Sequence, residues 1–238
     1  MQKIVCKDYN HMSETAAQLV LDALRDKPDG LFSFPGGDTP LGLFQAFVSK
    51  VNAGEADISI ASYVSLDEWV GMAATDEGSC GHFNYTNLLD KLAKPFARVH
   101  VIDGSADPYD QRDLLNAFIE ANGPLTVSVL GIGLNGHLGF NEEGTDFESA
   151  AHVVELAPTT RRVMKKYFGD KFDPKLGITQ GLGQIMQAQT VILLANGAHK
   201  AAIIKEALNG PVTPALPASI LQNHPNVYVV IDQEAAGE

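Results

Sequence analysis

The chain has 238 residues, of which 45% are hydrophobic and 19% charged, and its formal net charge at pH 7 is -12. This length suits one large α/β domain or two small ones, and an acidic chain without a compensating basic patch argues against a nucleic-acid partner. No apolar run reaches the roughly 18 residues that a membrane helix needs, so we expect no membrane span.

The two cysteines, Cys6 and Cys80, are far apart in the sequence, and the first residues lack the apolar stretch of a signal peptide. We therefore expect reduced thiols in a cytoplasmic protein. The seven histidines are scattered, and no Cys/His cluster has the spacing of a zinc site. We expect neither a metal nor a cofactor.

Short apolar runs alternate with helical patterns along the whole chain. We predict strands at 3–6, 30–34, 61–66, 98–102, 127–130, 191–195 and 227–231, and helices at 13–26, 41–51, 84–92, 109–122, 160–168, 182–188, 197–208 and 217–222. Ser13 is the expected N-cap of the first helix. Apolar strands separated by helices predict a doubly wound, mostly parallel, Rossmann-like sheet with helices on both faces, in a single domain over 1–238.

The first glycine-rich loop joins a predicted strand to a predicted helix and reads Pro-Gly-Gly-Asp-Thr-Pro at 35–40. Backbone N–H groups at the start of a helix favour phosphate, whereas the charge of Asp38 opposes an anion. The candidate anion-binding residues of this loop are Gly36, Gly37, Asp38 and Thr39. A plain turn is the alternative interpretation.

Two carboxylates, Asp67 and Glu68, follow the strand predicted at 61–66. The carboxyl ends of strands face the ligand crevice in open α/β sheets, which makes Asp67 a candidate site residue. The alternative is a solvated loop acid or a helix cap.

The most informative segment reads Gly-Ile-Gly-Leu-Asn-Gly-His-Leu-Gly-Phe-Asn-Glu at 131–142 and follows an apolar strand. Its glycines let the backbone turn sharply and approach a ligand closely. His137, five residues before Glu142, suggests proton transfer, and a packed or surface histidine is the alternative. The segment also contains a dinucleotide-binding Gly-x-Gly-x-x-Gly pattern, but it lies past mid-chain and no helix is predicted to follow it.

A further strand-to-helix junction reads Asn-Gly-Ala-His-Lys at 196–200. Lys200 in the first turn of a helix opposes the helix dipole, which suggests an anionic ligand there. An ordinary surface lysine is the alternative.

These segments, in this order and over nearly the whole chain, resemble the glucosamine-6-phosphate deaminase, or isomerase, family. The segment at 131–142 resembles the family signature, and Leu-Asp-Glu-Trp-Val-Gly at 66–71 resembles its Asp-Glu-aromatic motif. Gly-Asp-Thr-Pro at 37–40 resembles its phosphate loop, and His-Lys-Ala at 199–201 resembles its lysine motif.

The resemblance implies conversion of glucosamine 6-phosphate and water to fructose 6-phosphate and ammonia, by ring opening and proton transfer from C2 to C1. Asp67 would move that proton, His137 would open the pyranose ring, and Glu142 would orient His137. Asn135 lies where some relatives have aspartate and others asparagine. The implied partner is therefore a small amino-sugar 6-phosphate, and we expect a monomer or a small homo-oligomer.

The same resemblance assigns the phosphate of the substrate to Lys200 and to the loop at 36–39. Lys166 lies where relatives often have a phosphate-binding arginine, and a lysine there keeps the charge but loses the bidentate fork. Asp38 replaces a residue that is usually small.

Three alternatives remain open. Trp69, Cys80 and Ala150 resemble galactosamine-6-phosphate members, whose product would be tagatose 6-phosphate. The second is a 6-phosphogluconolactonase, a family that shares the fold but typically has Asp-Gly-His-x-Ala-Ser-Leu-Phe-Pro at the central motif. The third is a non-catalytic sugar-phosphate sensor, against which the joint presence of Asp67, His137 and Glu142 argues.

Overall fold

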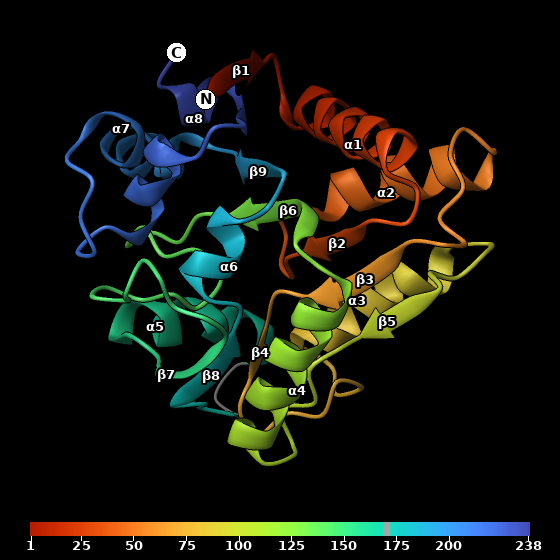
Figure 1. The fold of residues 1–238 in the computed structure, drawn as a ribbon. Helices are drawn as coiled ribbons and strands as arrows, with labels where there is room; N and C mark the ends of the chain where they lie inside the picture. The colour runs from red at the N-terminus through yellow and green to blue at the C-terminus, as the bar shows by residue number, and fades with distance from the viewer. Residues whose placement is uncertain (169–171) are drawn as a thin grey trace.

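The computed structural model describes residues 1–168 and 172–238, and all of their side chains except those of residues 164–168. Its centre is a seven-stranded sheet in the order β1-β10-β9-β6-β2-β3-β5, with all neighbouring strands parallel (Figure 1). The strands are β1 Gln2–Cys6, β2 Leu31–Phe34, β3 Ser62–Ser65, β5 Arg98–His100, β6 Leu125–Gly131, β9 Thr190–Ala195 and β10 Val227–Asp232.

Helices cover both faces of this sheet, as the alternation of strands and helices predicts. The α-helices are α1 Tyr9–Asp26, α2 Leu41–Asn52, α3 Cys80–Asn87, α4 Pro108–Asn122, α5 Pro158–Phe168, α6 Leu182–Met186, α7 Ala201–Asn209 and α8 Gln233–Ala236. The 3-10 helices are η1 Leu89–Lys91, η2 Ala198–Lys200 and η3 Pro217–Asn223. No helix within the described ranges is long and apolar enough to cross a membrane.

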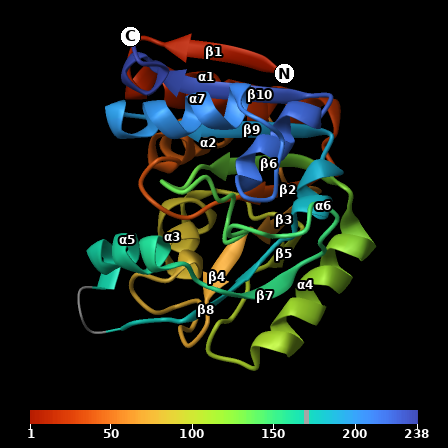
Figure 2. The same cartoon turned by 90° about the vertical axis from the view of Figure 1, so that its left-hand side faces the viewer.

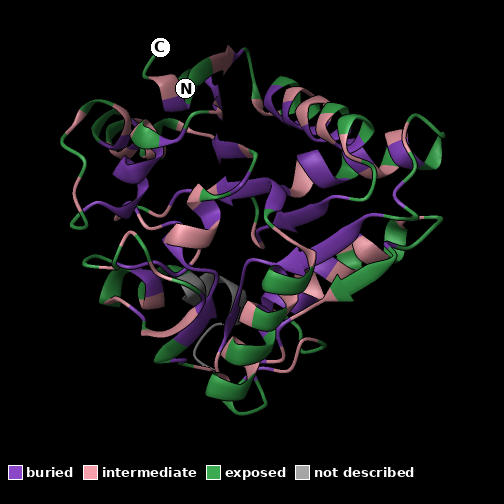
Figure 3. Cartoon of the chain, in the orientation of Figure 1, coloured by how far each residue is buried: buried purple, intermediate pink, exposed green. Residues whose placement is uncertain are grey.

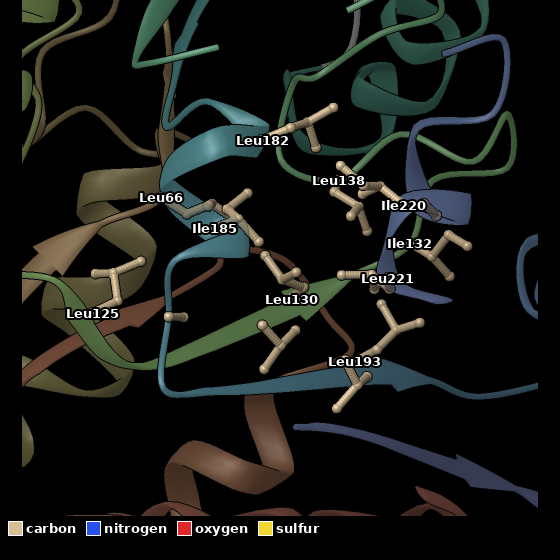
Figure 4. Close-up of a cluster of buried hydrophobic side chains, with 14 of the residues drawn as sticks. Leu66, Leu125, Leu130, Ile132, Leu138, Leu182, Ile185, Leu193, Ile220 and Leu221 are labelled. Atoms are coloured by element: carbon tan, nitrogen blue, oxygen red, sulfur yellow. The ribbon is translucent and has the colours of Figure 1, made fainter. Parts of the chain in front are cut away.

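The side chains of the central strands divide alternately between two cores. In β9, Val191 and Leu193 join the cluster under α6, α7 and η3, whereas Ile192 and Leu194 join the cluster under α1 and α2. Figure 4 shows Leu193 in the first cluster, packed with residues of β6, α6 and η3. Figure 3 shows the middle strands buried and the outer faces of the helices exposed. Burial on both faces explains why β9 is apolar at every position from Val191 to Ala195 rather than at alternate positions.

A second, smaller sheet was not predicted from the sequence. It is antiparallel, in the order β4-β8-β7, with β4 at Asp67–Trp69, β8 at Leu176–Thr179 and β7 at His152–Glu155. Its three strands all lie in segments for which the sequence analysis predicts no strand. Strands of three and four residues are too short to produce a clear period-2 pattern in the sequence.

Two helix starts also differ from the prediction, because the capping groups lie elsewhere. The first helix begins at Tyr9, where Asp8 accepts the His11 N–H at 2.8 Å, while Ser13 lies inside the helix and donates to the Tyr9 carbonyl. The helix expected at 84–92 begins at Cys80, where the Ser79 hydroxyl accepts the His82 N–H. Sequence patterns locate helices better than they locate helix ends.

The connections of the central sheet place a crevice between β2 and β6. From β2 the chain continues outward through β3 and β5, and from β6 it continues in the other direction through β9. The loops after these two strands therefore diverge at the carboxyl edge. Such a switch point is where open α/β sheets bind ligands.

Gln180, which follows β8 and is fully buried, joins the small sheet to the central one. Its amide nitrogen donates to the Ser33 hydroxyl at 2.8 Å and to the Ser65 carbonyl at 2.9 Å. Its backbone carbonyl accepts the Asn141 side-chain N–H at 2.8 Å, and its backbone N–H donates to the Leu66 carbonyl. One side chain thus ties together the ends of β2 and β3.

Replacing this side chain should destabilise the protein through unpaired buried groups. We expect Gln180→Ala to lower the free energy of unfolding by about 2–4 kcal/mol, because it leaves polar atoms at Ser33 and Ser65 unpaired and opens a cavity. Urea denaturation measures this, with the exposed Gln187→Ala as the control, for which we expect a change within about 0.5 kcal/mol. Equal, small effects of the two substitutions would contradict the assigned role of Gln180.

Candidate active site

A cavity of about 520 Å³ opens at the carboxyl edge of the central sheet. Its walls come from the loops after β2, β6 and β9, from β4, and from helices α3 and α5, both of which lie left of centre in the view of Figure 2. The candidate residues from the sequence that line it are Gly36, Gly37, Asp38, Thr39, Asp67, Asn135, His137 and Lys200. Glu142 lies behind His137 and does not line the cavity, and the side chain of Lys166 lies outside the described residues.

Asp67 is a buried carboxyl group at the first position of β4, with 7% of its surface exposed. Burial raises its pKa to about 6, against the lowering effects of a hydrogen bond from Cys80 and of the charge of His137. The segment at 131–142 passes close by, since a Cβ added at Gly139 would lie 3.4 Å from Asp67 Oδ2 and 2.7 Å from Thr179 Oγ1. Asp67 is therefore neither a solvated loop acid nor a helix cap, and it can accept a proton near neutral pH.

The neighbouring Glu68 points away from the cavity and is fully buried. It accepts the backbone N–H groups of Trp69 at 2.8 Å, Cys80 at 3.0 Å and Gly81 at 2.7 Å. These bonds attach the start of α3 to β4, and they place Cys80 beside both Asp67 and Gly36. The two adjacent carboxyl groups therefore differ in function: Asp67 lines the cavity, whereas Glu68 stabilises the start of α3, which forms part of the cavity wall.

His137 belongs to a hydrogen-bonded cluster centred on Glu142. Oε2 of Glu142 lies 3.3 Å from His137 Nδ1 and accepts the Asn135 side-chain N–H at 2.8 Å. Oε1 accepts the Thr160 hydroxyl at 2.6 Å and the Ala157 N–H at 3.1 Å. Although burial raises its pKa, the bonds from His137, Thr160 and Asn135 bring the pKa of Glu142 down to about 2.

Gly133 makes room for the imidazole. A Cβ at this position would lie 2.4 Å from His137 Nε2, so no other residue fits without displacing the ring. The Gly133 N–H donates to the His137 carbonyl at 3.0 Å, which closes the turn. Gly133 of the Gly-x-Gly-x-x-Gly pattern therefore accommodates the ring of His137. No helix follows the pattern directly, which agrees with the prediction and argues against a dinucleotide-binding site.

The loop at 35–40 is held from behind by Tyr9. The hydroxyl of Tyr9 lies 3.1 Å from the carbonyl oxygens of Asp38 and Thr39, and it accepts the Gly42 N–H at 2.8 Å. The Thr39 hydroxyl donates to the Asn196 side chain at 3.1 Å, which joins this loop to the one after β9. Asp38 is exposed, so its charge is partly screened by water.

Lys200 lies at the end of η2, one residue before α7, and not inside a continuous helix over 197–208 as predicted. Its ammonium group donates to the Ile132 carbonyl at 2.6 Å, just beyond the end of β6. The lysine is therefore directed into the cavity between the loops after β6 and β9, unlike an ordinary surface lysine.

Several cavity residues were not among the candidates. Thr160 is 5% exposed and contacts both His137 and Glu142, and Cys80 and Trp69 line the space beside Asp67. Trp69 stacks obliquely on Phe140, with ring centroids 4.3 Å apart. Thr160 with Arg161 is part of the resemblance to the family, but the sequence assigned Thr160 no role, because that role depends on a contact across 18 residues of sequence.

Comparisons with known proteins agree with this geometry. A profile of the family of glucosamine-6-phosphate isomerases and 6-phosphogluconolactonases matches residues 8–229. A glucosamine-6-phosphate deaminase of Shouchella clausii is 38% identical over 239 residues, covering 99% of this chain and 96% of the relative.

Solved structures give the same result at the level of the fold. A monomeric glucosamine-6-phosphate deaminase superposes with a TM-score of 0.95 at 30% identity, covering 100% of this chain and 99% of the other. A 6-phosphogluconolactonase from Trypanosoma brucei superposes with a TM-score of 0.78 at 18% identity, covering 99% and 97%, which shows a shared fold only. With the profile matching most of its length, the chain belongs to the family of glucosamine-6-phosphate isomerases and 6-phosphogluconolactonases.

Proposed function

We propose that this protein is a glucosamine-6-phosphate deaminase, which converts glucosamine 6-phosphate and water to fructose 6-phosphate and ammonia. The observation that carries the proposal is the pair of contrasting acids at the cavity. Burial leaves Asp67 with a pKa of about 6, whereas Glu142 beside His137 has a pKa of about 2. Environments that separate two carboxyl groups in this way assign one to proton transfer and the other to orienting a partner.

Ring opening is the first step, and we assign it to His137. The imidazole donates a proton to the ring oxygen of the sugar as the bond from that oxygen to C1 breaks, while the C1 hydroxyl loses its proton to water and becomes the aldehyde. Ionised Glu142 behind the ring stabilises the imidazolium form that is needed as the acid.

Asp67 then transfers the proton between carbons. Its carboxylate removes the proton from C2 of the open aldose while the C1 oxygen takes a proton from water, and it then delivers the C2 proton to C1, so that the carbon–nitrogen bond becomes a C2 iminium beside a C1 hydroxyl. Water adds to C2 and ammonia leaves, which gives the ketose. Because burial raises the pKa of Asp67 to about 6, its carboxylate is a stronger base than that of a solvated aspartate and is still mostly ionised at neutral pH.

The phosphate group lies, in this proposal, between Lys200 and the loop at 36–39. Lys200 and the backbone N–H groups before α2 supply positive charge. The family resemblance assigns the phosphate to Lys166 as well, whose side chain lies outside the described residues. We further propose that the protein acts in the cytoplasm as a single domain over 1–238, as a monomer or a small homo-oligomer, without a nucleic-acid partner.

A coupled assay of ammonia release from glucosamine 6-phosphate tests the proposal. Hydrolysis of 6-phosphogluconolactone without ammonia release would favour the lactonase, and tight binding of sugar phosphates without turnover would favour the sensor. Both results would contradict the deaminase.

The galactosamine sugar is the second candidate, since two of the residues that resemble galactosamine-6-phosphate members lie at the site. Trp69 and Cys80 both line the cavity, whereas Ala150 does not and is exposed. The epimers differ only at the C4 hydroxyl, so a difference in the cavity wall is what could distinguish them.

The dependence of activity on Asp67 should be visible in the pH profile. Because Asp67 must be ionised to act, we expect kcat/KM to fall about tenfold per pH unit as the pH drops below about 6. Asp67→Asn should lower kcat by about 10²- to 10⁴-fold and should lose this acid limb. Near-normal turnover of the variant, or an unchanged acid limb, would exclude Asp67 as the base.

Lys200→Ala should mainly raise KM, because a phosphate contact stabilises the ground state and the transition state alike. Loss of one charged hydrogen bond predicts an increase of about 10- to 100-fold. The exposed Lys205→Ala on α7 is the matched control and should change KM little. An equal loss of activity on a non-phosphorylated amino sugar would place Lys200 outside the phosphate site.

Competition kinetics between the two amino sugars should show a preference for glucosamine 6-phosphate. A buried group that pairs with one C4 hydroxyl is left unpaired by the other epimer, so the efficiencies should differ by at least about tenfold, or about 1.4 kcal/mol. Preference for galactosamine 6-phosphate would reverse the choice of sugar. Equal kcat/KM values for the two sugars would mean that the site does not recognise the C4 hydroxyl.

A further inference from the structure

Thr160 lies between the imidazole and the carboxylate that orients it. Its Oγ is 2.6 Å from Glu142 Oε1 and 3.2 Å from His137 Nδ1. The residue is 5% exposed and belongs to the first turn of α5, from which the preceding Ala157 N–H also reaches Glu142 Oε1. One threonine therefore connects the docking of α5 to the position of the histidine.

The protons available to Glu142, Thr160 and His137 determine which of their atoms donate hydrogen bonds and which accept them. An ionised carboxylate only accepts, and a hydroxyl group has a single proton, so the 2.6 Å contact directs the Thr160 proton to Glu142. The Thr160 oxygen then presents lone pairs to His137 Nδ1. Because Glu142 Oε2 is also an acceptor, at 3.3 Å from the same nitrogen, Nδ1 faces two acceptors and must carry hydrogen.

The other ring nitrogen is then left for the substrate. Nε2 lies on the side of Gly133, where the missing side chain leaves room, and both residues line the cavity. With Nδ1 protonated, the neutral ring has its lone pair on Nε2, and the charged ring has a donor there. The opposite tautomer would present a donor to the cavity even in the neutral ring and could not accept a proton from the sugar.

We propose that Thr160 is a positioning residue that, together with Glu142, holds His137 in the Nδ1-protonated tautomer and directs Nε2 at the sugar. Glu142 alone makes only a long contact to Nδ1, and Thr160 adds the second acceptor while it holds the carboxylate in place. The effect of this arrangement on turnover rests on the proposed function, whereas the tautomer itself does not.

Nitrogen-15 NMR of the full-length protein measures the tautomer directly, since the unprotonated nitrogen of a neutral imidazole resonates far downfield of the protonated one. His137→Gln assigns the two signals among the seven histidines. Thr160→Val removes the hydroxyl and keeps the branched shape, Thr160→Ser restores the hydroxyl, and Thr159→Val removes a hydroxyl from the exposed neighbouring position.

We expect the unprotonated signal of neutral His137 to belong to Nε2 in the wild type, in Thr160→Ser and in Thr159→Val. In Thr160→Val the two signals should move toward each other, as the tautomers mix. Ammonia release should fall about tenfold in kcat in Thr160→Val, the effect of losing one hydrogen bond, and should recover to within about twofold in Thr160→Ser.

An unprotonated Nδ1 in the wild type would overturn the proposal, as would wild-type signals in Thr160→Val, whatever its activity. Shifted signals with unchanged kcat would also overturn it, because the tautomer would then not limit the reaction. If the wild type releases no ammonia while the signals behave as expected, the deaminase proposal fails and the positioning role of Thr160 stands.

Discussion

Glu142 is a buried negative charge, and the arrangement of the site follows from the donors that it requires. Burying a carboxylate is costly unless hydrogen bonds replace its hydration. Here the donors are Asn135 and His137 from the loop after β6, and Ala157 and Thr160 from the start of α5. Satisfying one charge therefore brings a loop of the central sheet together with the helix that lies between strands β7 and β8 of the small sheet, and it orients the imidazole between them.

Asp67 is also a buried carboxyl group, but its pKa is raised to about 6, whereas that of Glu142 is lowered to about 2. The strongest influence on Asp67 is burial, and its partners, a thiol and a distant imidazole, lower its pKa only in part. The neighbouring Glu68 accepts three backbone N–H groups and fastens α3 to β4, and burial nevertheless raises its pKa to about 8. Burial therefore raises the pKa of both adjacent carboxyl groups, and of the two only Asp67 lines the cavity.

The two sheets explain why these groups face one cavity. The central sheet reverses its strand order between β2 and β6, so the loops after these strands diverge and leave space at the carboxyl edge. The small antiparallel sheet stands at this edge, where β4 carries Asp67 and β8 pairs with it. Gln180 fixes the small sheet to Ser33 and Ser65, and β4 of this sheet carries Asp67, the proposed base.

The sequence by itself determined the class of fold, the strands of the central sheet other than their exact ends, and the loops that carry the chemistry. These features are local: apolar runs, helical periodicity and glycines at turns are written in neighbouring residues. The resemblance of its motifs likewise pointed to the family to which the chain belongs. Only the tertiary structure decided that Asp67 begins a strand of a second sheet and that Glu142 stands behind His137. It also decided that Thr160 completes their cluster and that Lys200 is held by the Ile132 carbonyl. These facts depend on contacts between residues far apart in sequence and on burial, which sets the pKa of each acid, and no local pattern encodes either.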